Sequence, residues 1–183
     1  MAVVATLCGA ALASAQDTVQ LSTNFYNISG ATEWELRQSI NQSRPWKDKD
    51  ATDARTEWKI QWTYTSIPAG ETRRLRSLET RTTITYTLPR WTPGPEAPKT
   101  LRDRWTKYSA ALKTHEDGHS RIALVAAGEI RKRVNALPEP PAAARLDKQI
   151  NDIANKVVAE YRAVEATYDK KTTHGASQGA HFP

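Results

Sequence analysis

The sequence predicts an α+β domain in which strands and a short helix come first, and two long helices and an ordered tail follow. Before residue 92, apolar and polar residues alternate with the period of two that a β-strand requires. After residue 98, apolar residues recur every three or four positions, as they do in helices. Between the two regions, the stretch RWTPGPEAPK at residues 90–99 carries three prolines and a glycine, which end the strand region.

The first fifteen residues, MAVVATLCGAALASA, are uncharged and end in Ala13-Ser14-Ala15, a pattern typical of signal peptidase sites. We predict a signal peptide at residues 1–15, cleaved after Ala15, and a periplasmic or secreted chain whose residues 16–183 form one domain. The basic residues that usually open a signal are absent, and a buried N-terminal helix or strand is the alternative. The single cysteine, Cys8, lies in this segment, so the mature chain would have no disulfide bond. No apolar stretch is long enough to form a transmembrane segment.

Residues 18–28, 57–67 and 80–89 are the predicted strands, because large apolar residues occupy every second position in each. These residues are Val19, Leu21 and Phe25 in the first strand, Trp58, Ile60, Trp62 and Tyr64 in the second, and Ile84, Tyr86 and Leu88 in the third. The second and third are separated by a turn signal at residues 67–70 and a basic stretch, ETRRLRSLETR, at residues 71–81. We therefore expect them to pair, and predict a small antiparallel sheet with the basic stretch near the connection.

Three segments predict helices. In residues 32–42, Thr32 and Glu35 match a capping box, and Leu36 and Ile40 share a face. The first long helix would run for nearly forty residues, which is long enough to expect a bend at Gly118 or Gly128. Its apolar stripe consists of Leu101, Trp105, Tyr108, Leu112, His115, His119, Ile122 and Ala126. The stripe of the second consists of Leu146, Ile150, Ile153, Val157, Tyr161, Val164 and Tyr168.

The stretch THEDGHSR at residues 114–121 places His115 and His119 on the first stripe, four residues apart. This spacing stacks both imidazoles on one face of a helix, about one helical pitch apart. A shared zinc ion would accept one nitrogen from each ring, and the other nitrogens would need acceptors of their own. Glu116 lies about 100° round the helix and can instead reach a water at the metal, as in the H-E-x-x-H motif. That motif has only three fixed positions, so an ordinary polar patch is the alternative.

A catalytic zinc needs three protein ligands, and the extended form of the motif is absent because Val125 stands where its third histidine would be. The chain has four histidines, and the remaining two, His174 and His181, lie in the last ten residues. We predict His174 as the third ligand, with Asp169 as the second choice. A glutamate could also supply this ligand, and the candidates are Glu129, Glu160 and Glu165.

Two segments resemble a known bacterial family, which is catalogued as a domain of unknown function and described as predicted secreted zinc-dependent proteases. WTKYSAALKTHEDGHSRIA at residues 105–123 is similar to its W-x-x-Y…H-E-x-G-H helix, and YDKKTTHGASQGAHFP at residues 168–183 to its C-terminal Y-D-x-x-T-x-H-G-x-x-Q-G-A-x-F-P signature. The resemblance covers the C-terminal half well and the strands loosely. It implies zinc and proteolysis. By position it implicates His115, Glu116, His119, Tyr168, Asp169, Thr172, His174, Gly175, Gln178 and Gly179.

The resemblance favours His174 as the ligand, and it places Asp169, Tyr168 and Gln178 behind the ligands or as substitutes for one. The first functional hypothesis is therefore a zinc metallopeptidase of an abbreviated zincin-like type, with Glu116 as general base and protein or peptide as substrate. Tyr108 or Tyr168 could donate a hydrogen bond to the substrate oxygen, although core packing is the favoured explanation for each.

The second hypothesis is a non-catalytic envelope protein in which a structural metal supports binding of a partner or an anionic polymer. The formal net charge of +6 also raises nucleic-acid binding, but the basic residues are dispersed and export is expected, so we predict no nucleic-acid partner. The substrate and the oligomeric state stay open at this point.

Overall fold

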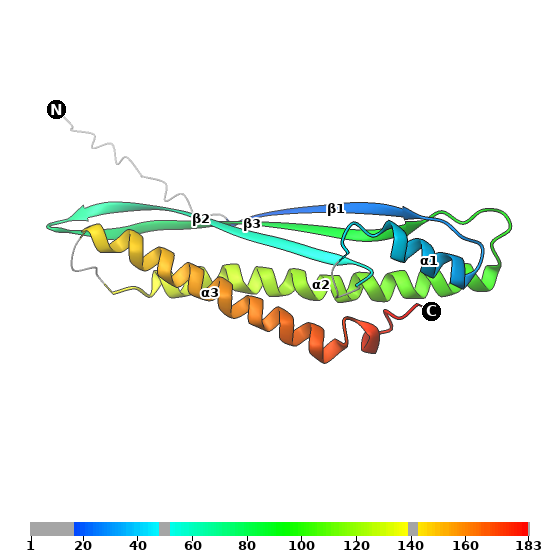
Figure 1. Ribbon diagram of the computed structural model, residues 1–183. Helices are drawn as coiled ribbons and strands as arrows, with labels where there is room; N and C mark the ends of the chain where they lie inside the picture. Colours follow the sequence, from blue (N-terminus) through cyan, green and yellow to red (C-terminus); the bar gives the residue numbers. More distant parts are fainter. Residues whose placement is uncertain (1–16, 48–51, 139–142, 183) are drawn as a thin grey trace, which may run out of the picture.

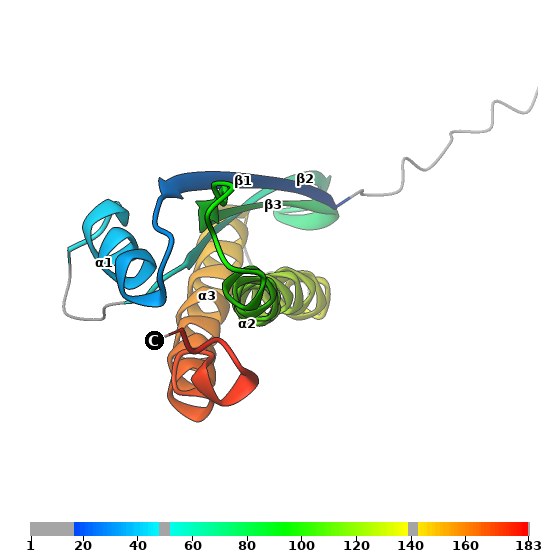
Figure 2. The same cartoon turned by 90° about the vertical axis from the view of Figure 1, so that its right-hand side faces the viewer.

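The computed structural model describes residues 17–47, 52–138 and 143–182. Its elements follow in the order β1 (Thr18–Ile28), α1 (Glu33–Ser43), β2 (Arg55–Ala69), β3 (Thr72–Trp91), α2 (Lys99–Asn135), α3 (Ala143–Thr172) and the 3-10 turn η1 (Ala176–Gln178). The strands form one layer (Figure 1), and the view along the molecule shows α2 and α3 together beneath it (Figure 2). The predicted α+β class is confirmed, whereas the predicted signal peptide at residues 1–15 lies outside the described residues. None of the described helices is both long and apolar enough to cross a membrane.

The sheet has the strand order β1-β3-β2. β2 and β3 pair antiparallel, with Arg55 opposite Thr87, which confirms the predicted pair. β1 pairs parallel to β3, with Thr18 opposite Arg81, so the prediction of an antiparallel sheet is wrong for this strand. After β1 the chain passes through α1 and starts β2 near the same end of the sheet. β2 therefore runs back against β1, and β3 returns between them.

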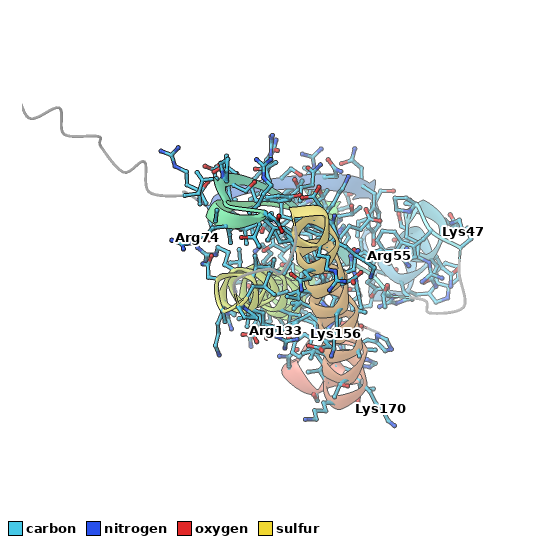
Figure 3. All side chains as sticks on the ribbon, turned by 90° about the vertical axis from the view of Figure 1, so that its left-hand side faces the viewer. Lys47, Arg55, Arg74, Arg133, Lys156 and Lys170 are labelled. Atoms are coloured by element: carbon cyan, nitrogen blue, oxygen red, sulfur yellow. The ribbon has the colours of Figure 1, made fainter. Side chains whose placement is uncertain are left out.

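The basic stretch at residues 71–81 lies next to the connection, as predicted, but all of it after Glu71 belongs to β3, which begins at Thr72. Only Gly70 and Glu71 separate the two strands, and Gly70 has the positive φ of 64° that the tight turn requires. The positive side chains are spread over the molecule, with Arg74 on the hairpin and Arg133, Lys156 and Lys170 on the helices (Figure 3). Because residues 72–79 belong to β3, the β2–β3 hairpin is longer than predicted and gives the helices a longer sheet surface to pack against.

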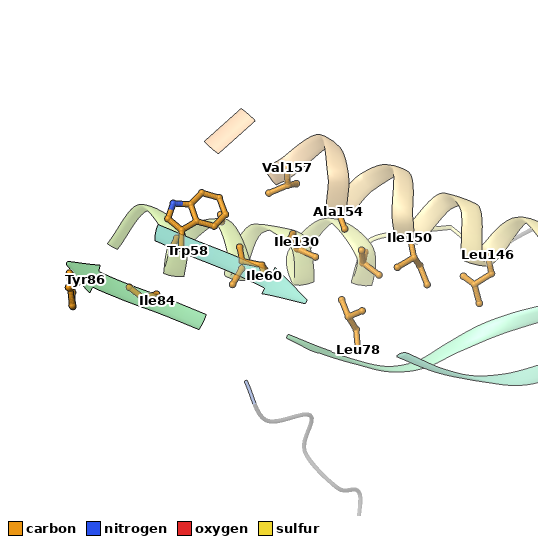
Figure 4. Packing of buried hydrophobic residues seen from close by; sticks show 14 residues of the cluster. Trp58, Ile60, Leu78, Ile84, Tyr86, Ile130, Leu146, Ile150, Ala154 and Val157 are labelled. Carbon is orange, nitrogen blue, oxygen red and sulfur yellow. The ribbon is translucent and has the colours of Figure 1, made fainter. Parts of the chain in front are cut away.

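The main hydrophobic core lies between the sheet and the C-terminal part of α2, together with the first half of α3 (Figure 4). Its labelled members are Trp58, Ile60, Leu78, Ile84, Tyr86, Ile130, Leu146, Ile150, Ala154 and Val157. Burying one large apolar side chain contributes roughly 1.5–3 kcal/mol, so this cluster is the main source of stability. The predicted apolar faces of β2 and β3 are confirmed.

Helix α2 is continuous over 37 residues, about 55 Å, and neither Gly118 nor Gly128 interrupts it. The capping box of Thr32 and Glu35 at the start of α1 is present, as predicted. The stripe of α2 faces the interior. In α3 the predicted stripe holds up to Tyr161, which packs against the core, but Val164 is exposed because the helix leaves the sheet towards its C-terminal end.

Candidate metal centre

His115 and His119 lie one turn apart on α2, both buried, and face the C-terminal half of α3. Their Nε2 atoms are 3.3 Å apart and the ring planes are nearly perpendicular. The four-residue spacing thus brings one nitrogen of each ring to the same point, as the sequence predicted.

Asp169, near the end of α3, adds a third atom to this pair. Its Oδ1 lies 2.9 Å from His119 Nε2 and 3.2 Å from His115 Nε2. In a tetrahedral site with zinc–ligand distances of 2.0–2.1 Å, neighbouring ligand atoms are about 3.3 Å apart. The three atoms therefore form the triangle that one face of such a site requires, and the group as a whole could hold a metal ion.

The outer nitrogens of both histidines have acceptors of their own. His115 Nδ1 lies 2.9 Å from Gln178 Oε1, and His119 Nδ1 lies 3.3 Å from Glu165 Oε1. Each ring that donates from Nδ1 presents an unprotonated Nε2 to the centre. Two lone pairs then face Asp169 Oδ1, which is buried and has no well-formed hydrogen bond despite its short distances to both rings. Three acceptors without a donor are unfavourable unless a cation joins them.

That cation is either a metal ion or a proton. Burial alone would lower the pKa of His119, but the adjacent carboxylates of Asp169 and Glu165 outweigh it and raise the pKa to about 9. Burial likewise opposes ionisation of Asp169, and the two histidines more than compensate and lower its pKa. Two imidazoles and one carboxylate form a donor set that suits zinc, so the residues fit the predicted cofactor.

Glu116 lies beside this group and is buried. Thr56 of β2 donates a 2.6 Å hydrogen bond from its hydroxyl to Glu116 Oε2. Burial raises the pKa of this carboxyl, and the Thr56 hydrogen bond and the two histidines only partly offset the effect. A raised pKa makes the carboxylate a stronger base, which is the property that its predicted role requires.

The triangle and Glu116 line one pocket of about 280 Å³. Residues 52–56, at the start of β2 and just before it, form one wall, and α2 and α3 form the other. Arg162 and Glu165 of α3 lie in the second wall and are joined by a 2.8 Å ion pair. A partly open pocket of this kind, lined by both polar and apolar groups, can admit part of a substrate to the metal centre.

His174 lies on the rim of the pocket and not in the triangle. Its side chain is half-exposed, and its Nδ1 lies 4.0 Å from Asp169 Oδ2. Thr173 and His174 both have a φ near 50°, so the chain leaves α3 in a left-handed turn. In this arrangement the third position belongs to Asp169, and the ligand role of His174 stays a prediction.

Tyr168 packs flat on the His115 ring at a centroid distance of 5.0 Å, and its hydroxyl donates to the His115 carbonyl at 3.1 Å. Gly118 makes this possible, because a Cβ there would overlap the Tyr168 hydroxyl. Gly175 has a similar role: a Cβ would lie 2.9 Å from His115 Cγ. Gly118 therefore leaves room for the Tyr168 side chain of α3, and it does not bend α2.

The other residues that the sequence offered as ligands or catalytic groups lie outside the triangle. Glu129 and Glu160 pair with Arg133, and the Tyr108 hydroxyl donates to Asp53 at 2.6 Å in a second cluster. Glu165 contacts His119 but is not in the triangle. Thr56 as the partner of Glu116, and Glu165 as the acceptor for His119, were not predicted from the sequence, because neither lies near the motif in the chain.

The profile of a family described as "Bacterial protein of unknown function (DUF922)" matches residues 23–175. The chain belongs to this family. The match covers most of the chain and includes Glu116 and all three residues of the triangle, and it confirms the resemblance at the level of the family. Gln178 lies just beyond it. No curated protein and no solved structure matches the chain.

Proposed function

We propose that the protein is a zinc-dependent hydrolase of amide bonds that acts on protein or peptide substrates outside the cytoplasm. The observation that carries the proposal is the convergence of three ligand atoms from His115, His119 and Asp169 next to a buried carboxylate, Glu116, that is not one of them. A structural metal site has no need of such a carboxylate. Amide hydrolysis needs both parts in one pocket.

His115, His119 and Asp169 would hold the metal. When bound, zinc acidifies a water and polarises a carbonyl, which is the chemistry that amide hydrolysis needs. The carboxylate of Glu165 and the amide oxygen of Gln178 keep the two rings turned with Nε2 towards the centre. Tyr168 restricts the His115 ring further by stacking on it.

Glu116 is the proposed general base. Thr56 holds its Oε2, so the carboxylate keeps a fixed orientation at the pocket. It takes a proton from the attacking water and returns it to the leaving nitrogen as the C–N bond breaks, so that the products are a carboxylic acid and an amine. The raised pKa of Glu116 suits a group that must both accept and release this proton.

The position of His174 supports a second candidate function, in which the metal site is structural and not catalytic. Its imidazole is close to Asp169, and a rotation that brought it onto the metal would give four protein ligands. A closed site of that kind has no position for substrate and would stabilise the fold instead. The protein would then bind a partner or an anionic polymer, which is the second hypothesis that the sequence raises.

Glu116→Gln separates the two candidates, because it keeps the size of the side chain and removes the base. We expect peptide hydrolysis to fall by roughly two to four orders of magnitude, with unchanged zinc content. Asp117→Asn is the matched control, since Asp117 is the next residue on α2 and pairs with Lys113 and Tyr86. Full turnover by Glu116→Gln would refute the proposed mechanism, and zinc binding without any turnover in a broad peptide library would favour the structural site.

A further inference from the structure

Strand β1 exposes apolar side chains that the fold does not cover. Val19, Leu21 and Phe25 are 53%, 58% and 50% exposed, and all residues from 17 to 25 are exposed. These three share a face with Ile84 and Leu88 of β3, which pack inward. The apolar row thus continues the inner face of the sheet beyond the helices.

The exposure follows from the topology. β1 is an edge strand, and within the described residues it pairs only with β3. Helix α2 packs against β3 and β2 and leaves the face of β1 open. Leu124 of α2 is 42% exposed and lies on the same side of the helix as Arg131, which forms an ion pair with Asp17 just before β1. Strand and helix therefore expose apolar side chains towards the same region.

The free edge of β1 also lacks the usual protection of edge strands. Soluble proteins place charges, prolines or bulges there, because an open edge pairs readily with another strand. No residue from Thr18 to Ile28 is charged or a proline, and the pairing of β1 with β3 runs through all eleven residues without a shift in register.

We propose that β1 pairs antiparallel with β1 of a second copy of this chain, which joins two three-stranded sheets into one. A two-fold axis at Ser22 places Val19 opposite Phe25 of the second copy and Leu21 opposite Thr23. All four positions lie on the helix-facing side, so the apolar rows of the two copies lie side by side and contact each other across the joint. In this register every odd-numbered residue of β1 lies opposite an odd-numbered residue of the second copy, so the apolar side chains of both copies stay on the same face of the joined sheet.

Charge complementarity supports this register. It places Asp17 opposite Asn27 of the second copy. Arg90 donates to the Asn27 side chain at 3.1 Å, and its guanidinium lies 5.2 Å from the Phe25 ring. Asp17, which already contacts Arg131 and Thr80 in its own copy, would therefore lie near Arg90 of the other copy at both ends of the interface. The inference is independent of the metal centre and of the proposed activity.

The first test is the oligomeric state of the chain from Gln16 onward, measured by sedimentation velocity over a range of concentrations. We expect a dimer that Leu21→Lys converts to a monomer with an unchanged circular dichroism spectrum. Val125→Lys is the matched control, because Val125 is 56% exposed on α2 and lies about 100° from Leu124, away from β1. A monomeric wild type, or a dimer that Leu21→Lys leaves intact, would overturn the proposal.

The second test is the register, and the lack of cysteine after Cys8 makes it direct. Ser22→Cys should form a disulfide-linked dimer on mild oxidation, because it meets itself at the two-fold axis. Gln20→Cys and Asn24→Cys should each stay monomeric on a denaturing gel but cross-link when mixed, since only the mixed pair is within disulfide reach. Cross-linking of Gln20→Cys alone, or none in the mixture, would contradict this register, and a peptide from another protein on β1 would leave all three variants uncross-linked.

Discussion

The metal centre and strand β1 depart in opposite ways from the usual distribution of side chains. At the metal centre three ionisable side chains, those of His115, Glu116 and His119, are buried, whereas in β1 Val19 and Leu21 are more than half exposed. Folded domains normally bury apolar groups and leave ionisable groups in water. Each departure costs free energy in the isolated chain, and each is relieved by a partner: a metal ion in the first case and, as proposed, a second copy in the second.

The two regions differ in how firmly the fold constrains them. Tyr168, Gln178 and Glu165 fix the imidazoles through stacking and hydrogen bonds, whereas β1 is held by one neighbouring strand. Substitutions near the metal centre should therefore change stability and metal affinity together. Substitutions in β1 should change association and leave the metal centre intact.

The largest effect on stability is expected for Gly118→Ala. The new Cβ would overlap the hydroxyl and ring of Tyr168, and such overpacking costs roughly 1–3 kcal/mol. Gly128→Ala on the same helix is the control, since its Cβ would meet nothing closer than 3.9 Å. This control should gain roughly 0.5–1 kcal/mol from the higher helix propensity of alanine. Urea unfolding measures both, and equal effects of the two substitutions would show that Tyr168 does not pack as described.

Glu165→Gln tests the support of His119. It keeps the shape of the side chain but weakens the acceptor for His119 Nδ1, so zinc affinity should fall by roughly 10–100-fold. Competition with a chromogenic chelator measures the change. Glu129→Gln removes a carboxylate that pairs with Arg133 and should leave affinity unchanged. A loss of the same size in both variants would mean that charge, and not contact with His119, controls the affinity.

A further expected effect is a pH dependence of the metal-free chain. The pKa of His119 rises from 6.5 to about 9 on folding, so protonated His119 stabilises the folded chain. This contribution is fully present below pH 6.5 and is lost as pH rises through about 9. Urea unfolding with a chelator should show a decline over this range that is absent in His119→Gln. With excess zinc the decline should also disappear, because the metal replaces the proton.

The sequence predicted the parts of the site that lie within one element. His115, Glu116 and His119 follow from a helical spacing, and the apolar stripes follow from the period of each segment. The third position required knowledge of how α3 ends. Asp169, predicted only as the second choice, reaches the centre from α3 itself, whereas His174 lies beyond the helix in a left-handed turn with Thr173 and stays outside the triangle.

The direction of β1 was equally inaccessible. Its alternation showed a strand, but its parallel pairing depends on where the chain enters β2, which is a property of the whole topology. The apolar positions of β1 had the period of a buried face, and only the placement of α2 beneath β3 and β2 left them exposed.

Zinc content of Asp169→Ala and His174→Ala tests the central claim most directly. The wild type should bind about one zinc per chain. His174→Ala should keep it, because His174 lies outside the triangle, and Asp169→Ala should lose most of it while circular dichroism shows an intact fold. Full zinc in Asp169→Ala together with its loss in His174→Ala would contradict the site described and make His174 the third ligand.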